Sequence, residues 1–323
     1  MRWLIPFVLL LAAPAQAFDL QGHRGARGLA PENTLAAFET ALALGVTTLE
    51  LDLAMTNDDV LVVSHDRTLN PDFTRGPDGR FLDRPGPAIR SLTFAELQRY
   101  DVGRLEPGSA YAAGFPEQRA VDGARIPALA DLFDLVKRLG ADHVRFNIET
   151  KITPTSGAET PDPATFAAAF AKAVREAGLT ARVSMQSFDW RTLAALRRIA
   201  PEIERVCLTV EALTFDSIRR GEPGPSPWLA GLDVDDLAGS VPRLVAAAGC
   251  ATWSPLYRNA KPDDVTAAKA LGLKVIPWTV NERADMERLI ALGVDGIITD
   301  YPDRLRAVMA ERNMPLPPQV PSR

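Results

Sequence analysis

This 323-residue chain has three histidines, and two of them stand in motifs suited to acid–base chemistry. His23 stands in the run Gly-His-Arg-Gly and His65 in the run Ser-His-Asp. Histidine titrates near neutral pH, so two of them beside one site can serve as general acid and general base. Arg24 adds a planar fork of donors that suits a phosphate group. These residues predict acid–base chemistry on a phosphorylated substrate.

Carboxylates alternate with apolar residues in two β-like runs. Side chains alternate between the two faces of a strand. In Thr48–Leu53 this rule places Glu50 and Asp52 on one face and the leucines on the other. In Arg145–Lys151 it places Glu149 on the same face as Lys151 and Asn147. We therefore expect three carboxylates and one lysine to converge if the two strands are neighbours.

Three carboxylates in a partly buried site need compensating positive charge. Lys151 offsets one of them, and a divalent cation would offset the rest. A set of oxygen ligands suits Ca²⁺ or Mg²⁺, and we favour Ca²⁺ because the set is flexible and the chain is expected to be exported. Two alternatives are solvated charges at strand ends and ion pairs with arginines of the insertion described below. A glycosidase with paired carboxylates is a third, but it would leave His23, His65 and Arg24 without a task.

The elements that must position these residues alternate between short β-branched runs and helical patterns. This alternation predicts parallel βα units, and eight strands predict an α/β fold of the (β/α)₈ or TIM-barrel type. The expected strands are Asp19–His23, Thr48–Ala54, Val144–Thr150, Arg182–Ser187, Arg205–Thr209, Ala251–Ser254, Lys274–Thr279 and Gly296–Thr299. The expected helices are Thr34–Leu44, Pro163–Ala177, Trp190–Ile199, Val241–Ala248, Asp263–Leu271, Arg283–Leu292 and Tyr301–Ala310. The acidic residues and two of the histidines then lie at the C-terminal rim, where barrel enzymes keep their sites. His143 precedes a strand and is expected at the opposite rim, in a structural role.

The alternation of strands and helices is interrupted in several places. Residues 67–125 are rich in Gly, Pro, Arg and Asp and are interpreted as an insertion after the second strand, reached through a hairpin arm at Asp59–Ser64. Gly221–Gly239 is a second irregular stretch. The barrel domain is expected to span residues 18–311, and residues 312–323 are expected to form a mobile tail.

Residues 1–17 have the pattern of a secretory signal peptide. Arg2 precedes an apolar run, and Ala15-Gln16-Ala17 has the small-x-small form of a cleavage site. The run is shorter than the ~20 residues of a membrane-spanning helix and contains prolines, which disfavours a stable membrane anchor. We therefore expect an exported protein, periplasmic or secreted. That compartment permits a disulfide between Cys207 and Cys250 without requiring one.

The overall charge gives little reason to expect nucleic acid as a partner. The formal net charge is −5 and no basic block is present. Nucleic-acid binding would need a basic stripe. The sequence does not indicate an oligomeric state.

The ordered set of motifs resembles the glycerophosphodiester phosphodiesterase family. The resemblance runs through the following segments: His23-Arg24-Gly25, Pro31-Glu32-Asn33-Thr34, Glu50-Leu51-Asp52, His65-Asp66, Asn147-Ile148-Glu149, Trp278-Thr279-Val280-Asn281 and Thr299-Asp300-Tyr301-Pro302. It covers nearly the whole chain after residue 17. It implies a metal-dependent TIM barrel that hydrolyses glycerophosphodiesters to sn-glycerol 3-phosphate and an alcohol.

The resemblance also implies roles for individual residues. Glu50, Asp52 and Glu149 match metal ligands, and His23 and His65 match two catalytic histidines. Arg24 matches a phosphate-binding arginine and Lys151 a substrate-facing lysine. Trp278 matches an aromatic residue near the alcohol pocket, and Gln186 is a further candidate for substrate binding; for both, a role in the barrel core is the alternative. Two other functions stay open: a lysophospholipase D-like enzyme that acts at a membrane, and an exported binding protein without catalysis.

Overall fold

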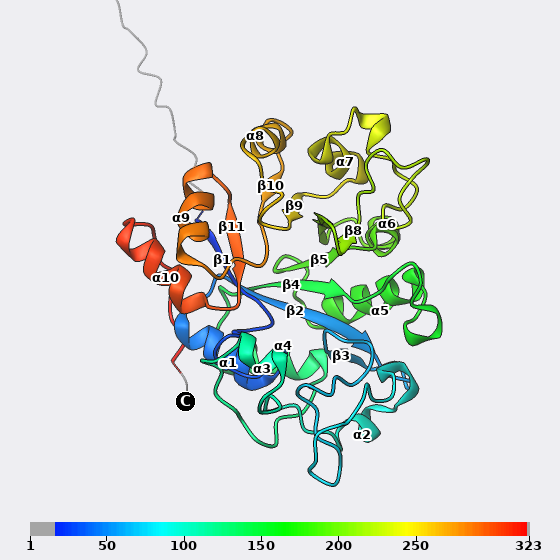
Figure 1. The fold of residues 1–323 in the computed structure, drawn as a ribbon, viewed down its shortest axis with the longest axis vertical. Coiled ribbons are helices and arrows are strands. Elements are labelled where there is room, and N and C mark those ends of the chain that lie inside the picture. The colour runs from blue at the N-terminus through cyan, green and yellow to red at the C-terminus, as the bar shows by residue number, and fades with distance from the viewer. Residues whose placement is uncertain (1–16, 322–323) are drawn as a thin grey trace, which may run out of the picture.

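The structure, a computed structural model, describes residues 17–321 and is built around an eight-stranded parallel barrel (Figure 1). Its strands are β1 (Asp19–Gly22), β2 (Thr48–Met55), β4 (Arg145–Thr150), β5 (Val183–Ser187), β6 (Glu204–Thr209), β9 (Thr252–Pro255), β10 (Lys274–Val275) and β11 (Gly296–Thr299). They are hydrogen-bonded in the order β10-β9-β6-β5-β4-β2-β1-β11. The two ends of this order meet, because the Asp295 N–H donates to Val275 O over 2.9 Å and the Ile298 N–H to Pro277 O over 3.0 Å. The predicted TIM barrel is confirmed, and all eight predicted strands form.

Helices cover the outside of the barrel. They are α1 (Leu35–Leu44), α4 (Leu129–Arg138), α5 (Pro163–Glu176), α6 (Trp190–Ile199), α7 (Val241–Ala248), α8 (Pro262–Ala270), α9 (Arg283–Leu292) and α10 (Pro302–Glu311). The Thr34 hydroxyl caps α1, and Gly45, Gly249 and Gly293 end their helices in the left-handed conformation. Seven of these helices were predicted. The missing one, α4, has an amphipathic pattern that was overlooked beside the irregular insertion; its buried face consists of Leu129, Leu132, Phe133, Leu135 and Val136.

The insertion after β2 forms a lobe with a small core of its own. It starts from β3 (Leu61–Val63), which pairs antiparallel with β2 as the predicted hairpin arm, and includes η1 (Ile89–Ser91), α2 (Phe94–Leu97) and α3 (Ala110–Gly114). The lobe core is Ala54, Val62, Leu69, Ile89, Leu97, Val102 and Ile126. The remaining short elements are η2 (Gly157–Glu159), the hairpin β7 (Glu211–Ala212) with β8 (Phe215–Asp216), and η3 (Asp235–Leu237). The predicted irregular stretch Gly221–Gly239 contains only η3.

The C-terminal segment differs from the mobile tail that we expected. The Val320 N–H donates to Leu42 O at the end of α1, and the Val320 side chain is buried. The Arg306 side chain donates to Pro317 O over 2.8 Å. Prolines exclude regular structure in this segment, but they do not prevent such contacts.

The expected signal peptide lies almost wholly outside the described residues. Within residues 17–321, no helix is both long enough and apolar enough to cross a bilayer.

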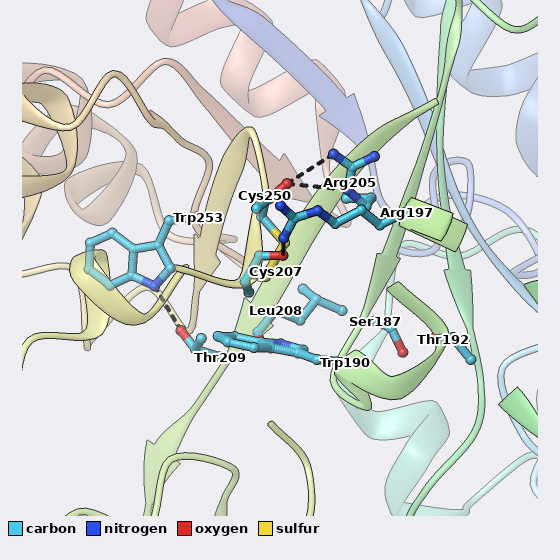
Figure 2. The surroundings of a disulfide bond; sticks show 12 residues. Ser187, Trp190, Thr192, Arg197, Arg205, Cys207, Leu208, Thr209, Cys250 and Trp253 are labelled. Atoms are coloured by element: carbon cyan, nitrogen blue, oxygen red, sulfur yellow. Dashed lines mark hydrogen bonds between the residues drawn. A yellow bond between two sulfur atoms is a disulfide. The ribbon is translucent and has the colours of Figure 1, made fainter. Parts of the chain in front are cut away.

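Cys207 and Cys250 form a disulfide between neighbouring strands (Figure 2). Cys207 lies on β6 opposite Trp253 of β9, and Cys250 lies two residues before β9 begins. The two Cα atoms are 5.9 Å apart, within the range that a disulfide spans. The Arg205 side chain donates to Gly249 O over 3.0 Å beside the disulfide, so side-chain hydrogen bonds tie the same two segments together.

Candidate active site

The register of β2 and β4 brings the three predicted carboxylates together. Asp52 lies beside Glu149, and Glu50 lies beside Asn147, in adjacent positions of the two parallel strands. Since their side chains point into the barrel, one ligand oxygen from each of Glu50, Asp52 and Glu149 lies within 4.8 Å of the others. All three residues are buried.

Neighbouring donors fix the orientation of each carboxylate. Glu50 Oε2 accepts from the Arg24 N–H over 2.9 Å, and Glu50 Oε1 accepts from Gln186 Nε2 over 2.6 Å. Asp52 Oδ2 accepts from Asn33 Nδ2 over 2.9 Å. Glu149 Oε1 accepts from Lys151 Nζ over 2.9 Å. The cluster is therefore held in one arrangement by groups from four segments of the chain.

An unusual backbone conformation aims the Arg24 N–H at Glu50. Arg24 has a φ of 50°, in the left-handed region that non-glycine residues seldom adopt. Gly25 follows with a φ of 84°, and a Cβ there would lie 2.7 Å from the Ala37 carbonyl carbon of α1. Strained turns of this kind persist where the surrounding structure fixes them, as functional sites do.

The negative charge of the cluster fits a divalent cation. Burial and the neighbouring Asp52 raise the pKa of Glu50 well above its usual value. Burial also raises the pKa of Glu149 to about 7, although Lys151 opposes this shift. Burial acts on Asp52 too, but Arg24 and Lys151 outweigh it and lower the pKa of that carboxyl. Three oxygen donors with too little positive charge around them are what a hard cation binds.

His23 lines the cavity and is held by a carboxylate that lies directly after the last strand. Its Nδ1 lies 2.6 Å from Asp300 Oδ1, and its Nε2 lies 3.9 Å from Glu50 Oε2. Asp300 is fixed in turn by Arg27, whose Nε and Nη2 donate to it over 2.8 and 3.0 Å. Burial lowers the pKa of His23 to about 4, although Asp300 opposes the shift. The ring is therefore neutral near neutral pH, and its Nε2 faces the carboxylate cluster.

His65 lies across the cavity, nearer to solvent. Its Nδ1 lies 2.8 Å from Asp66 Oδ1, and Asn70 Nδ2 donates to Asp66 Oδ2 over 2.7 Å. Burial lowers the pKa of His65, and the cations Arg24 and Lys151 lower it further. His23, His65, Glu50, Glu149, Arg24 and Lys151 all line one cavity of about 190 Å³. Each histidine of the pair thus has a carboxylate on one nitrogen.

Two cations lie among the carboxylates. Arg24 Nη1 donates to Glu32 Oε1 over 2.6 Å, and Arg24 Nε lies 3.3 Å from Asp52 Oδ2. Lys151 Nζ lies 3.8 Å from Asp52 Oδ1 in addition to its bond with Glu149. Both side chains reach the cavity, where a phosphate would meet them.

The remaining candidates lie where the strand pattern placed them. Gln186 is opposite Glu149 in the β4–β5 register, and Trp278 lies after β10 with its indole N–H donating to Ser254 O over 3.0 Å. Both line the same cavity as the histidines. His143 is exposed in the turn before β4, at the N-terminal end of the strands.

Comparison with known proteins agrees with this geometry. Residues 23–304 match the model of the glycerophosphoryl diester phosphodiesterase family. The chain belongs to this family. A curated glycerophosphodiester phosphodiesterase from Caldanaerobacter subterraneus subsp. tengcongensis is 32% identical over 285 residues, which cover 88% of this chain and 94% of the relative.

Solved structures of the family share the fold. A Silicibacter pomeroyi protein assigned to the glycerophosphoryl diester phosphodiesterases superposes with a TM-score of 0.81 at 35% identity, covering 94% of this chain and 96% of that one. An Oleispira antarctica phosphodiesterase in complex with the product sn-glycerol-3-phosphate superposes with a TM-score of 0.65 at 22% identity, covering 90% and 96%. At that identity the second likeness concerns the fold.

The sequence analysis assigns no role to the residues that hold His23. Asp300, which contacts His23, belongs to one of the family-like motifs but was given no function there. Arg27 and Asn281, which both donate to Asp300, were likewise given none. One signal was available. A closed barrel places its last strand beside its first, so an acidic residue directly after β11 lies next to the histidine after β1.

Proposed function

We propose that this protein hydrolyses glycerophosphodiesters to sn-glycerol 3-phosphate and a free alcohol. The observation that carries the proposal is the convergence on one cavity of Glu50, Glu149, two carboxylate-bound histidines, Arg24 and Lys151, with Asp52 grouped with the two glutamates. The membership of the family and the product named for the Oleispira relative support the choice of substrate and product.

The cations and the carboxylates divide the work of binding. Glu50, Asp52 and Glu149 would hold a divalent cation, which when bound neutralises charge on a phosphate oxygen. Arg24 and Lys151 reach the same space and bind the remaining phosphate oxygens. Their bonds to Glu32 and Glu149 keep both side chains in place before the substrate arrives.

The two histidines move the protons. Asp300 binds His23 at Nδ1 and Asp66 binds His65 at Nδ1, so in each ring Nε2 is the nitrogen left to exchange a proton with the substrate. One histidine is neutral and removes the proton from the attacking oxygen at its Nε2, and the other enters the reaction protonated at Nε2 and gives that proton to the leaving alcohol oxygen as its bond to phosphorus breaks. The attacking oxygen is that of water or the glycerol 2-hydroxyl; the second route passes through a cyclic phosphate that water then opens.

The cation and the location are parts of the same proposal. An all-oxygen donor set on two strands supports Ca²⁺, with Mg²⁺ as the second choice. The signal-peptide pattern of residues 1–17 supports export, and the Cys207–Cys250 disulfide is compatible with an oxidising compartment.

One assay tests the proposal. Purified protein with Ca²⁺ is given glycerophosphocholine or lysophosphatidylcholine, and the release of glycerol 3-phosphate and of choline is measured. Glycerol 3-phosphate from the first substrate supports the proposal. Choline released only from the second would instead indicate a lysophospholipase D, and no product from either would contradict catalysis.

A further inference from the structure

A second, larger cavity opens directly from the catalytic one. It measures about 760 Å³, within the size range of small-molecule sites. The two cavities share five lining residues: His65, Glu149, Lys151, Phe188 and Trp278. A phosphodiester bound at the carboxylate cluster has two ester arms, so one arm extends into this larger space.

Four aromatic side chains from separate segments form one wall of the larger cavity. Phe188 follows β5, Phe215 lies on β8, Trp228 lies in the loop before η3, and Trp278 follows β10. The Phe188 ring centroid is 5.2 Å from that of Trp278 and 5.4 Å from that of Phe215. The centroids of Phe215 and Trp228 are 4.9 Å apart.

The four rings pack edge to face and are not stacked in parallel. Neighbouring rings are inclined at 82°, 62° and 61°. All four side chains are half-buried and thus keep part of their surface open. Ring faces carry negative electrostatic potential and attract cations that lie within ~6 Å of the ring centre.

The lining of the larger cavity is also acidic. Besides Glu149 and Lys151, which pair with each other, it includes Asp66, Asp72, Glu159 and a single arginine, Arg67. Arg67 Nε pairs with Glu159 over 2.9 Å, and Asp66 is bound to His65. Among the contacts of residues 17–321, the Asp72 carboxylate has no hydrogen bond or ion pair. The cavity that holds the aromatic wall therefore also carries excess negative charge.

We propose that this cavity binds the leaving alcohol and selects one that carries a quaternary ammonium group, choline. The inference rests on the proposed function. A primary ammonium needs hydrogen-bond acceptors on three sides, and the aromatic wall supplies ring faces in their place. A quaternary ammonium has no N–H groups, and its methyl groups fit ring faces while the charge is balanced by Asp72.

A comparison of four substrates tests this selectivity. They are glycerophosphocholine, its uncharged isostere with 3,3-dimethylbutanol, glycerophosphoethanolamine and glycerophosphoglycerol. Since a cation on an aromatic face gains about 1–2 kcal/mol, kcat/KM for glycerophosphocholine should exceed that of the isostere by roughly 5–30-fold. Equal values for these two would overturn the choline site, whereas hydrolysis of none of the four would contradict the proposed function.

Variants outside the catalytic cavity locate the effect. Phe215→Leu and Trp228→Leu should each raise KM for glycerophosphocholine by about 5-fold, a larger factor than the change in KM for glycerophosphoglycerol. Tyr257→Leu, at the same rim but outside the cavity lining, is the matched control and should change neither.

Tetramethylammonium provides a test that does not depend on the substrate. It should inhibit glycerophosphoglycerol hydrolysis competitively in the wild type and more weakly in Phe215→Leu. Phe215 lies on a short hairpin, so its replacement leaves the barrel core intact. Uniform losses on all substrates, or unchanged inhibition in the variant, would overturn the assignment.

Discussion

At the scale of residues, the two histidines differ in their surroundings although each is bound to a carboxylate. His23 is buried and held by Asp300, whereas the His65 side chain keeps 31% of its surface exposed. The buried member is tied to the last strand of the barrel, and the exposed one to its own neighbour in the chain. In the proposed acid–base pair, one proton carrier would thus be fixed and the other more accessible to solvent.

Replacing either histidine should remove the acid–base step. His23→Ala and His65→Ala should each lower kcat by roughly 10²–10⁴-fold. Their losses should not add in the double variant, since the pair acts as a unit. Steady-state kinetics on glycerophosphocholine measures this, with the exposed His143→Ala as control.

An aryl phosphodiester assigns the two roles. Its leaving group needs little protonation, so this substrate should restore turnover in the variant that lacks the general acid. If His65→Ala kept most of its activity on glycerophosphocholine, the acid–base pair would be wrong.

Asp66 should contribute stability that depends on pH. Burial raises its pKa, but hydrogen bonds from His65 and Asn70 outweigh this and lower the pKa from 3.8 to about 2. The unfolded chain then binds the proton more tightly, so the contribution is complete above 3.8 and is lost as the pH falls towards 2. Asp66→Asn should cost about 1–2 kcal/mol near neutral pH, after allowance for partial exposure.

Urea unfolding at several pH values checks this contribution. The difference in unfolding free energy between the wild type and Asp66→Asn should shrink as the solution is acidified. A difference that stays constant down to low pH would show that the carboxylate contributes by shape alone.

At the scale of elements, the disulfide connects β6 with the segment before β9 and closes 43 residues of chain. That loop includes the β7–β8 hairpin and the stretch that carries Trp228. Restricting such a loop in the unfolded chain stabilises the folded protein by about 2–4 kcal/mol. Two of the four aromatic residues of the larger cavity, Phe215 and Trp228, are therefore carried by a loop with both ends fixed.

Breaking the disulfide should lower stability without stopping catalysis. The Cys207→Ala/Cys250→Ala double variant should melt at a lower temperature and keep its kcat, because neither cysteine lines the catalytic cavity. Thiol titration of the denatured, unreduced wild type should find no free thiol. Two free thiols would contradict the bond.

At the scale of the whole molecule, the carboxylate cluster would couple folding of the barrel to the binding of the proposed cation. Glu50, Asp52 and Glu149 meet only when β2 and β4 are paired, so a cation held by all three would bind the folded chain in preference to the unfolded one. At 100 times its Kd such a ligand stabilises by about 2.7 kcal/mol.

Chelation should therefore abolish turnover and lower Tm together. Ca²⁺ should restore both, and Mg²⁺ should restore them less well. In Glu149→Gln the Ca²⁺-dependent rise in Tm should be reduced, while the circular dichroism spectrum stays that of the wild type. Full activity after exhaustive removal of metal would contradict the role of the cluster.

The barrel and most of the candidate catalytic residues could be predicted from the sequence alone. Period-two alternation assigns the face of each strand residue, so Glu50, Asp52, Glu149 and Lys151 could be placed together before any coordinates. Helix α4 was not predicted, although the spacing of its apolar residues is that of an amphipathic helix. These features are local, because the order of residues within one strand or helix is enough to specify them.

Which distant groups meet depends on how whole elements pack, and no local sequence pattern indicates this. Asp300 reaches His23 because barrel closure joins strands that are 277 residues apart in the chain. Phe215 and Trp228 lie in segments without clear periodicity, and their position depends on how the loops fold over the rim. The bond between Cys207 and Cys250 likewise depends on the 5.9 Å separation of their Cα atoms, which the sequence does not reveal. Local periodicity carries no information about such contacts, because they are fixed by packing between elements rather than within them.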